Sequence, residues 1–191
     1  MVAVARARHW DDLEIRFPLT YRDRVLAAAG SAVDPAWVYA VIRQESSFRS
    51  DARSPVGALG LMQIMPATGR QIARELEDAD PPDLLQPETN IRYGAHYLQQ
   101  ILQRLQNNPV LATAAYNAGP NKVAQWLPSG DPASADVWAE TIPYRETRAY
   151  VQRVMEYAAV YRYLLGLQDA ETTLGARMKP VLPASAERTA G

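Results

Sequence analysis

Apolar residues recur at helical spacing in several segments of this chain, and no pair of segments shows the alternation typical of paired strands. The segments are separated by stretches rich in residues that favour turns, mainly proline, glycine, serine and aspartate. The pattern predicts helices over residues 21–29, 35–46, 67–77, 87–105, 109–115, 122–127 and 147–165. The chain is therefore expected to form a mostly α domain.

One predicted helix carries the first chemical candidate. Asp34 and Pro35 form a helix start signal, with aspartate as the N-cap and proline at the first helical position. Trp37, Val41 and Glu45 follow at intervals of four and therefore share one face. Loss of solvation beside this apolar face and the partial negative charge of the helix C-terminus both raise the pKa of Glu45. A carboxyl that keeps its proton near neutral pH can act as a general acid.

A second interpretation of Glu45 is a surface residue that pairs with a nearby arginine. Arg43, Arg49 and Arg53 are the candidates. The residues alone leave both interpretations open.

The loop after this helix is rich in residues suited to binding a sugar. Gly57 and Gly60 allow positive φ or the close approach of another group. Ser54 and Gln63 offer hydrogen-bonding groups, and Met65 offers a polarisable apolar surface. A tight loop that needs glycine only for its turns is the alternative.

Composition removes several functional classes. The 191 residues fit one domain, and a net charge of −1 with a pI of about 6.1 argues against nucleic acid as the main partner. The chain has no cysteine and only two histidines, His9 and His96, so neither a cofactor nor a metal site is expected. No segment is long and apolar enough to predict a transmembrane helix.

Five motifs, in this order, resemble the soluble lytic transglycosylases of the lysozyme-like superfamily. They are RQES at 43–46, SPVGA at 54–58, GLMQIMP at 60–66, AYNAG at 115–119 and IPYRETRAYV at 142–151. The resemblance implies a lysozyme-like multi-helix domain with a substrate groove. It covers residues 8–165.

The resemblance implies that Glu45 is the single catalytic acid and base. It would protonate the glycosidic oxygen between N-acetylmuramic acid and N-acetylglucosamine in peptidoglycan. It would then take a proton from the muramic acid 6-hydroxyl, which attacks the anomeric carbon and leaves a 1,6-anhydro end. Most glycosidases need two carboxylates, whereas here the intramolecular nucleophile replaces water and one suffices. Asp51 is the nearest second carboxylate, and a structural or solvated role is expected for it.

The same resemblance implies a set of substrate-binding residues: Ser54, Gln63, Met65, Tyr116, Asn117 and Glu146. Tyr116 is expected close to Glu45, where its phenol orients the carboxyl or the substrate N-acetyl group. Asn117 either holds its own turn through a backbone group or binds substrate. Glu146 meets the peptide stems of the glycan, or only supplies a favourable charge to the first turn of its helix. The four tyrosines of the last helix are expected to form core and groove wall; they are Tyr150, Tyr157, Tyr161 and Tyr163.

We expect a lead-in and first helix at 1–30, the catalytic domain at 31–166 and a flexible tail at 167–191. Family members carry a long helical region and a signal peptide ahead of the catalytic domain, and neither is evident here. The chain is therefore interpreted as an excised or truncated catalytic domain of a periplasmic enzyme whose partner is peptidoglycan. The alternatives are a goose-type-lysozyme-like muramidase that uses water, and a murein-binding module without catalysis.

Overall fold

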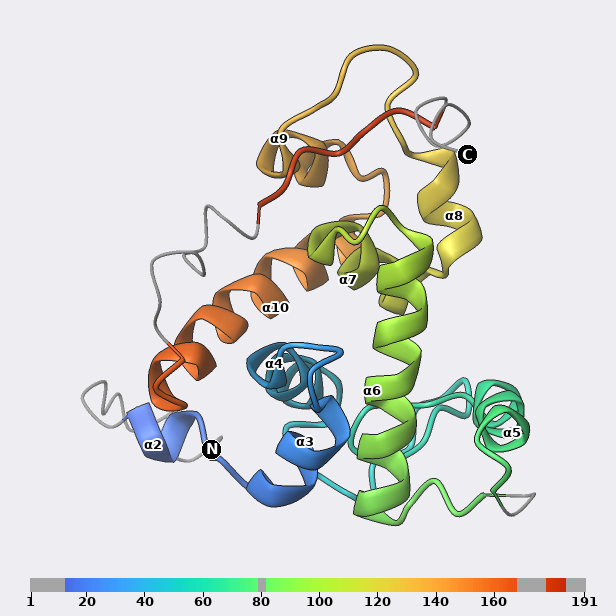
Figure 1. Cartoon of the computed structure of the whole chain (residues 1–191), viewed down its shortest axis with the longest axis vertical. Coiled ribbons are helices and arrows are strands. Elements are labelled where there is room, and N and C mark those ends of the chain that lie inside the picture. The colour runs from blue at the N-terminus through green and yellow to red at the C-terminus, as the bar shows by residue number, and fades with distance from the viewer. Residues whose placement is uncertain (1–12, 79–81, 168–177, 185–191) are drawn as a thin grey trace.

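The computed structural model describes residues 13–78, 82–167 and 178–184, and these residues are mostly helical (Figure 1). Within them the only β contacts are isolated bridges. The helices are α2 (Leu13–Arg16), α3 (Arg22–Ala29), α4 (Pro35–Ser46), α5 (Pro66–Glu75), α6 (Pro87–Arg104), α7 (Pro109–Ala118), α8 (Pro120–Gln125), α9 (Ala135–Thr141) and α10 (Arg145–Leu164). The predicted mostly α fold is confirmed, and the seven predicted helices are present with ends that differ by at most three residues.

Helix α4 lies at the centre, surrounded by α3, α6, α7 and α10 (Figure 1). The side chain of Asp34 accepts a hydrogen bond from the Ala36 N–H at 2.9 Å, and Pro35 occupies the first turn, as predicted. The next seven residues, 36–42, are all buried. A helix that is apolar on every side is stable only inside the protein, which explains why the other helices pack around this one.

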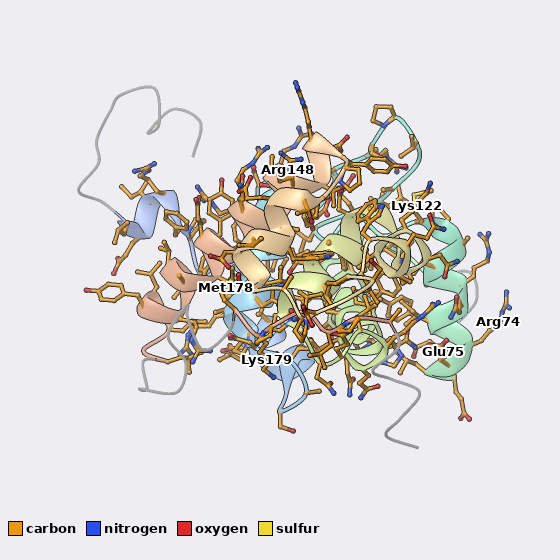
Figure 2. All side chains as sticks on the ribbon, turned by 90° about the horizontal axis from the view of Figure 1, so that it is seen from above. Arg74, Glu75, Lys122, Arg148, Met178 and Lys179 are labelled. Atoms are coloured by element: carbon orange, nitrogen blue, oxygen red, sulfur yellow. The ribbon has the colours of Figure 1, made fainter. Side chains whose placement is uncertain are left out.

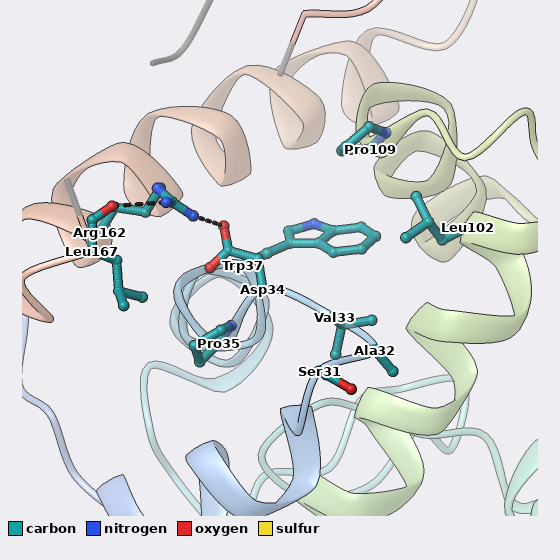
Figure 3. A pocket seen from close by; sticks show the side chains of 10 residues that line it. All are labelled: Ser31, Ala32, Val33, Asp34, Pro35, Trp37, Leu102, Pro109, Arg162 and Leu167. Carbon is teal, nitrogen blue, oxygen red and sulfur yellow. Dashed lines mark hydrogen bonds and ion pairs between the residues drawn. The ribbon is translucent and has the colours of Figure 1, made fainter. Parts of the chain in front are cut away.

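The longest helix, α10, packs along α4. Near its C-terminal end Arg162 forms an ion pair with Asp34 at 2.6 Å and donates a second hydrogen bond to the Leu167 carbonyl oxygen at 2.7 Å (Figure 3). Both charged side chains are largely buried. The N-terminus of α4 is thereby fixed to α10.

The N-terminal described residues are held on the same pair of helices through Arg43. Its guanidinium lies over the rings of Phe17 and Tyr157, 4.0 and 4.7 Å from their centroids, and donates a hydrogen bond to the Arg16 carbonyl oxygen. A cation held between two aromatic faces is a favourable arrangement. Arg43 therefore has a structural role.

Two features differ from the sequence-based expectation. Helices α2 and α9 were not predicted, because their four and seven residues give patterns too short to reveal helical periodicity. The expectation of a loose C-terminal tail is wrong for residues 178–184. Val181 is fully buried and exchanges backbone hydrogen bonds with Ala133. The Asn108 side chain donates a hydrogen bond at 3.0 Å to the carbonyl oxygen of Lys179, a residue labelled in Figure 2. The rest of the predicted tail, 168–177 and 185–191, lies outside the described residues.

No helix in the described part of the chain combines the length and apolar character that crossing a bilayer would require.

Candidate active site

Glu45 lies in the last turn of α4, half-buried where α10 passes. The Tyr150 hydroxyl donates a hydrogen bond to Glu45 Oε1 at 2.7 Å. Burial raises the pKa of Glu45 from 4.5 to about 7, the Tyr150 hydrogen bond opposes this increase, and the charge of Glu146 adds to it. Desolvation is thus the main cause, as the sequence predicted. At neutral pH the carboxyl is close to half protonated, which suits a group that must both give and take a proton.

The arginines near Glu45 in sequence do not pair with it. Arg43 is held by Phe17 and Tyr157, and Arg49 forms an exposed ion pair with Asp51 at 3.4 Å. Within residues 13–78, 82–167 and 178–184, no cation lies at ion-pair distance from Glu45. Burial is therefore not compensated by a positive charge, and the surface ion-pair interpretation of Glu45 has no support.

Tyr116 lies near Glu45 but is bonded elsewhere. Its hydroxyl donates to the Met62 carbonyl oxygen at 2.8 Å. Burial raises the pKa of Tyr116 well above its usual value, and the charge of Glu45 raises it further. Tyr116 thus lies within electrostatic range of Glu45, yet its hydroxyl proton orients the loop and not the carboxyl.

The candidate sugar-binding residues of the loop make hydrogen bonds within the loop. Ser54 Oγ accepts from the Ala58 N–H at 2.9 Å. The Gln63 amide donates to the carbonyl oxygens of Gly60 at 2.8 Å and Ala52 at 3.2 Å. Met65 is 42% exposed, directly before α5. Ser54 and Gln63 therefore shape the loop, while Met65 offers the exposed apolar surface.

The buried side-chain amide of Asn90, on α6, holds the loop against this helix. Asn90, on α6, accepts from the Met62 N–H at 2.7 Å and donates to the carbonyl oxygens of Leu59 and Leu84 at 2.9 and 2.7 Å. Gly60 combines φ of 76° with a position where a Cβ would lie 2.3 Å from the Asn90 amide, so glycine is required. On the next turn of α6 a Cβ at Gly94 would lie 2.1 Å from Met62 Sδ. The loop and α6 are therefore in direct contact.

The Tyr-Asn-Ala-Gly segment is tied to α10 at the other side of the site. Asn117 Oδ1 accepts a hydrogen bond from the buried Thr147 hydroxyl at 2.7 Å. This contact is neither of the two roles considered for Asn117, because the partner is a side chain of a remote helix. Glu146, the neighbour of Thr147, is exposed in the first turn of α10, where its charge acts on Glu45.

Sequence reasoning missed the role of Tyr150, which it assigned to the core and groove wall. Tyr150 is buried, as expected of a wall residue, but its hydroxyl also holds the carboxyl of a residue 105 positions earlier. The motif at 142–151 contains Tyr150, yet spacing along one helix cannot show which hydroxyl reaches a remote carboxyl.

Comparison with known proteins decides the family. The family model described as the transglycosylase SLT domain matches residues 26–137, more than half of the chain. This chain belongs to the transglycosylase SLT domain family. A second model, the soluble lytic transglycosylase helical domain, matches residues 141–169, which include α10. The SLT domain match contains both Glu45 and Tyr116.

Curated relatives of this SLT domain are similar over most of its length. The soluble lytic murein transglycosylase of Salmonella typhimurium is 43% identical over 173 residues, 88% of this chain and 27% of the relative. The same-named protein of Escherichia coli K12 is 42% identical over 179 residues, 91% of this chain and 27% of the relative. The chain thus spans about a quarter of the length of these relatives.

Solved structures match this SLT domain in fold. An inactive Glu-to-Gln variant of the lytic transglycosylase Slt from Pseudomonas aeruginosa superimposes with a TM-score of 0.85 at 42% identity, over 93% of this chain and 30% of that one. The 70-kDa soluble lytic transglycosylase of Escherichia coli gives 0.77 at 38% identity, over 89% and 29%. The predicted lysozyme-like helical fold agrees with these neighbours.

Proposed function

We propose that this chain is a lytic transglycosylase that cleaves the β-1,4 bond between N-acetylmuramic acid and N-acetylglucosamine in peptidoglycan. The observation that carries the proposal is Glu45, a half-buried carboxyl whose pKa is raised to about 7. It has no cationic partner within the described residues, and a tyrosine hydroxyl holds it in place.

In the proposed reaction the protonated Glu45 gives its proton to the glycosidic oxygen while the bond from that oxygen to the anomeric carbon breaks. The resulting carboxylate takes the proton of the muramic acid 6-hydroxyl, whose oxygen attacks the same anomeric carbon. The 1,6-anhydro bond forms, Glu45 regains its proton, and no water is consumed. A single carboxyl can serve both steps because its pKa lies near the working pH.

The other residues assist this carboxyl or bind substrate. Tyr150 acts as a positioning residue that fixes the orientation of the Glu45 carboxyl. Ser54, Gln63 and Tyr116 hold the loop that forms the floor of the sugar site, and Met65 contacts a sugar face. Asn117 fixes the Tyr-Asn-Ala-Gly turn against α10. We infer that Glu146, which is exposed, contacts the peptide stems of the glycan.

The relatives support this reaction, and the murein in their names is the reason to propose a periplasmic location. The two curated relatives are named soluble lytic murein transglycosylases. A Glu-to-Gln substitution inactivates the Pseudomonas aeruginosa enzyme, so a glutamate is essential there. A related 70-kDa enzyme has been solved with bulgecin A, at 37% identity and a TM-score of 0.77 over 89% of this chain and 29% of that one.

Mass spectrometry of digested peptidoglycan tests the proposal. The chain should release fragments with 1,6-anhydromuramic ends, and the Glu45→Gln variant should release none. Reducing muramic ends would instead identify a muramidase that uses water. Binding to peptidoglycan with no new ends, and without any effect of Glu45→Gln, would identify a murein-binding module.

A further inference from the structure

The chain reverses direction directly after Glu45, through a turn that is unusual for its residues. Helix α4 ends at Ser46, whose carbonyl oxygen accepts a hydrogen bond from the Arg49 N–H at 3.1 Å. The two central residues of this turn both have positive φ, 51° at Ser47 and 67° at Phe48. This is the arrangement of a type I′ turn, which normally contains asparagine and glycine. Neither residue here is glycine, so the backbone conformation is unfavourable and must be stabilised by other contacts.

The ring of Phe48 stabilises this turn by packing back onto two helices. Its centroid lies 6.2 Å from the ring centroid of Tyr39 on α4 and 6.4 Å from that of Tyr161 on α10. These two tyrosine rings are stacked at 4.9 Å and are fully buried. Because Tyr39 precedes Phe48 on the same helical segment, the ring contact requires the chain to turn back. The other central residue, Ser47, is exposed and cannot hold the turn by burial.

The turn also closes the end of α4 that carries Glu45. The backbone N–H of Ser47 donates to the Arg43 carbonyl oxygen at 3.1 Å and completes the last helical turn. Helix α10 contacts the chain on both sides of this point, at Glu45 through the Tyr150 hydroxyl and at Phe48 through an aromatic ring. If Ser47 and Phe48 left their positive-φ conformation, the last turn of α4 would fray and the Glu45 carboxyl would move away from Tyr150.

We propose that Phe48 is a positioning residue for the reaction at Glu45, because its aromatic contacts hold the strained turn that keeps the carboxyl beside Tyr150. The inference rests on the proposed function in taking Glu45 as the reacting group. Misplacing a reacting group by about 1 Å can cost on the order of 100-fold in rate. Loss of the ring should therefore lower kcat and leave KM nearly unchanged, since the ring packs on buried tyrosines.

Replacing Phe48 by alanine and by glycine separates positioning from packing. Both substitutions remove the ring, but glycine adopts positive φ without the cost that alanine incurs. On soluble glycan strands released by an amidase, we expect Phe48→Ala to lower kcat at least about tenfold, with KM within about twofold of wild type. Phe48→Gly should be at least about threefold more active than Phe48→Ala. A side chain that only fills space predicts the reverse order, since glycine also makes the chain more flexible.

Phe17 is the matched control, because the chain has two phenylalanines and both contact Tyr161. Phe17 is buried with its ring 5.5 Å from that of Tyr161, but it is not among the described residues with positive φ. Phe17→Ala and Phe17→Gly should both lower the melting temperature and leave kcat per folded molecule unchanged. The inference is overturned by a glycine variant at position 48 no more active than the alanine variant, by wild-type kcat in Phe48→Ala, or by an equal loss of kcat in Phe17→Ala.

The pKa of Glu45 gives a readout that needs no turnover. The titratable groups that act on Glu45 are Tyr150 and Glu146 of α10 and Tyr116 of α7, and all remain in these variants. Because desolvation is the main cause of the raised pKa, Phe48→Ala should let water reach the carboxyl and lower that pKa from about 7 toward 4.5. A ¹³C NMR titration, assigned with Glu45→Gln, measures it. An unchanged or higher pKa would contradict the positioning role.

A milder variant keeps the test available if Phe48→Ala does not fold. Phe48→Leu retains an apolar side chain and should lower the Glu45 pKa in the same direction by a smaller amount, and no change would count against the inference. The two proposals also fail separately. Anhydro ends from the wild-type chain with an unchanged Glu45 pKa in the Phe48 variants would refute only the positioning role. A lowered pKa without anhydro ends from the wild-type chain would refute only the transglycosylase reaction.

Discussion

The two ends of α4 each carry a carboxylate that α10 contacts, and the two contacts have opposite effects. At the N-terminus Asp34 caps the helix and forms an ion pair with Arg162 at 2.6 Å. At the C-terminus Glu45 receives a neutral phenol from Tyr150, feels the negative charge of Glu146, and has its pKa raised to about 7. One helix pair thus supplies an ion-pair partner to the acid at one end and raises the pKa of the acid at the other.

The nature of the partner explains this difference. A guanidinium compensates the cost of removing a carboxylate from water, whereas a neutral hydroxyl compensates only part of it. The helix dipole acts in the same direction, because negative charge is favoured at the N-terminus and disfavoured at the C-terminus. The Asp34 end therefore serves stability, and the Glu45 end serves chemistry at a cost in stability.

Removing the functional carboxyl should have the largest effect on rate. Glu45→Gln keeps the size and the hydrogen bond from Tyr150 but cannot give or take a proton, so we expect peptidoglycan cleavage to fall by about 10⁴-fold. Release of anhydromuropeptides, followed by chromatography, measures this. Glu156→Gln, an exposed acid on α10, is the control. A variant at position 45 that keeps wild-type turnover would remove Glu45 from the mechanism.

As the pH rises, the Glu45→Gln variant should become more stable than the wild-type protein. Glu45 titrates at about 7 in the folded chain against 4.5 for the unperturbed group, so between these values the folded state binds more protons than the unfolded state. Stability therefore falls as the pH rises through this window, by on the order of 3 kcal/mol once the pH exceeds 7. Glu45→Gln lacks this loss. Melting temperatures measured from pH 4.5 to 8 should diverge in its favour, and parallel curves would show that Glu45 is not desolvated.

The partner of the functional carboxyl can be tested by Tyr150→Phe. This hydrogen bond lowers the pKa of Glu45, so its loss should raise that pKa further and move the alkaline limb of the pH–rate profile upward. We also expect a rate about tenfold lower, because the carboxyl is less well oriented. Tyr116→Phe provides the contrast, since its hydroxyl bonds the Met62 carbonyl oxygen. It should lower the rate without moving the alkaline limb, and equal movement in both variants would contradict the assignment.

A substitution of Asp34, at the N-terminus of α4, should have the smallest effect. Asp34→Asn keeps an N-capping side chain but removes the charge that pairs with Arg162. Because this pair is mostly buried, we expect a loss of about 1–2 kcal/mol in the free energy of unfolding. Urea denaturation measures it, and turnover per folded molecule should not change. If Asp34→Asn lost activity but kept wild-type stability, the two ends of α4 would be coupled.

The sequence predicted α4 well because its signals are local. Asp34 and Pro35 mark the start, and the spacing of Trp37, Val41 and Glu45 places the carboxyl on the apolar face. Desolvation of Glu45 could therefore be predicted without knowing which other helices pack there. The long helices α6 and α10 were predicted for the same reason.

The parts that the sequence did not reveal depend on contacts between distant segments. Tyr150 looked like any other buried tyrosine of α10, and only packing against α4 brings its hydroxyl to Glu45. Asn117 was expected to bond locally or to substrate, but it receives the Thr147 hydroxyl. Residues 178–184 were expected to belong to a loose tail, yet Val181 pairs with Ala133. None of these partners can be identified from spacing along the chain.

The contact between Gly94 and Met62 has a consequence for genetic variation. A single added methyl group on α6 would meet the side chain of the buried Met62, the residue whose carbonyl oxygen anchors Tyr116. In a random mutagenesis library, alanine at position 94 should then appear among the inactive clones, although glycine-to-alanine changes within helices are commonly favourable. A position on the side of the loop that faces α6 would thus tolerate substitution as poorly as the residues that face the sugar.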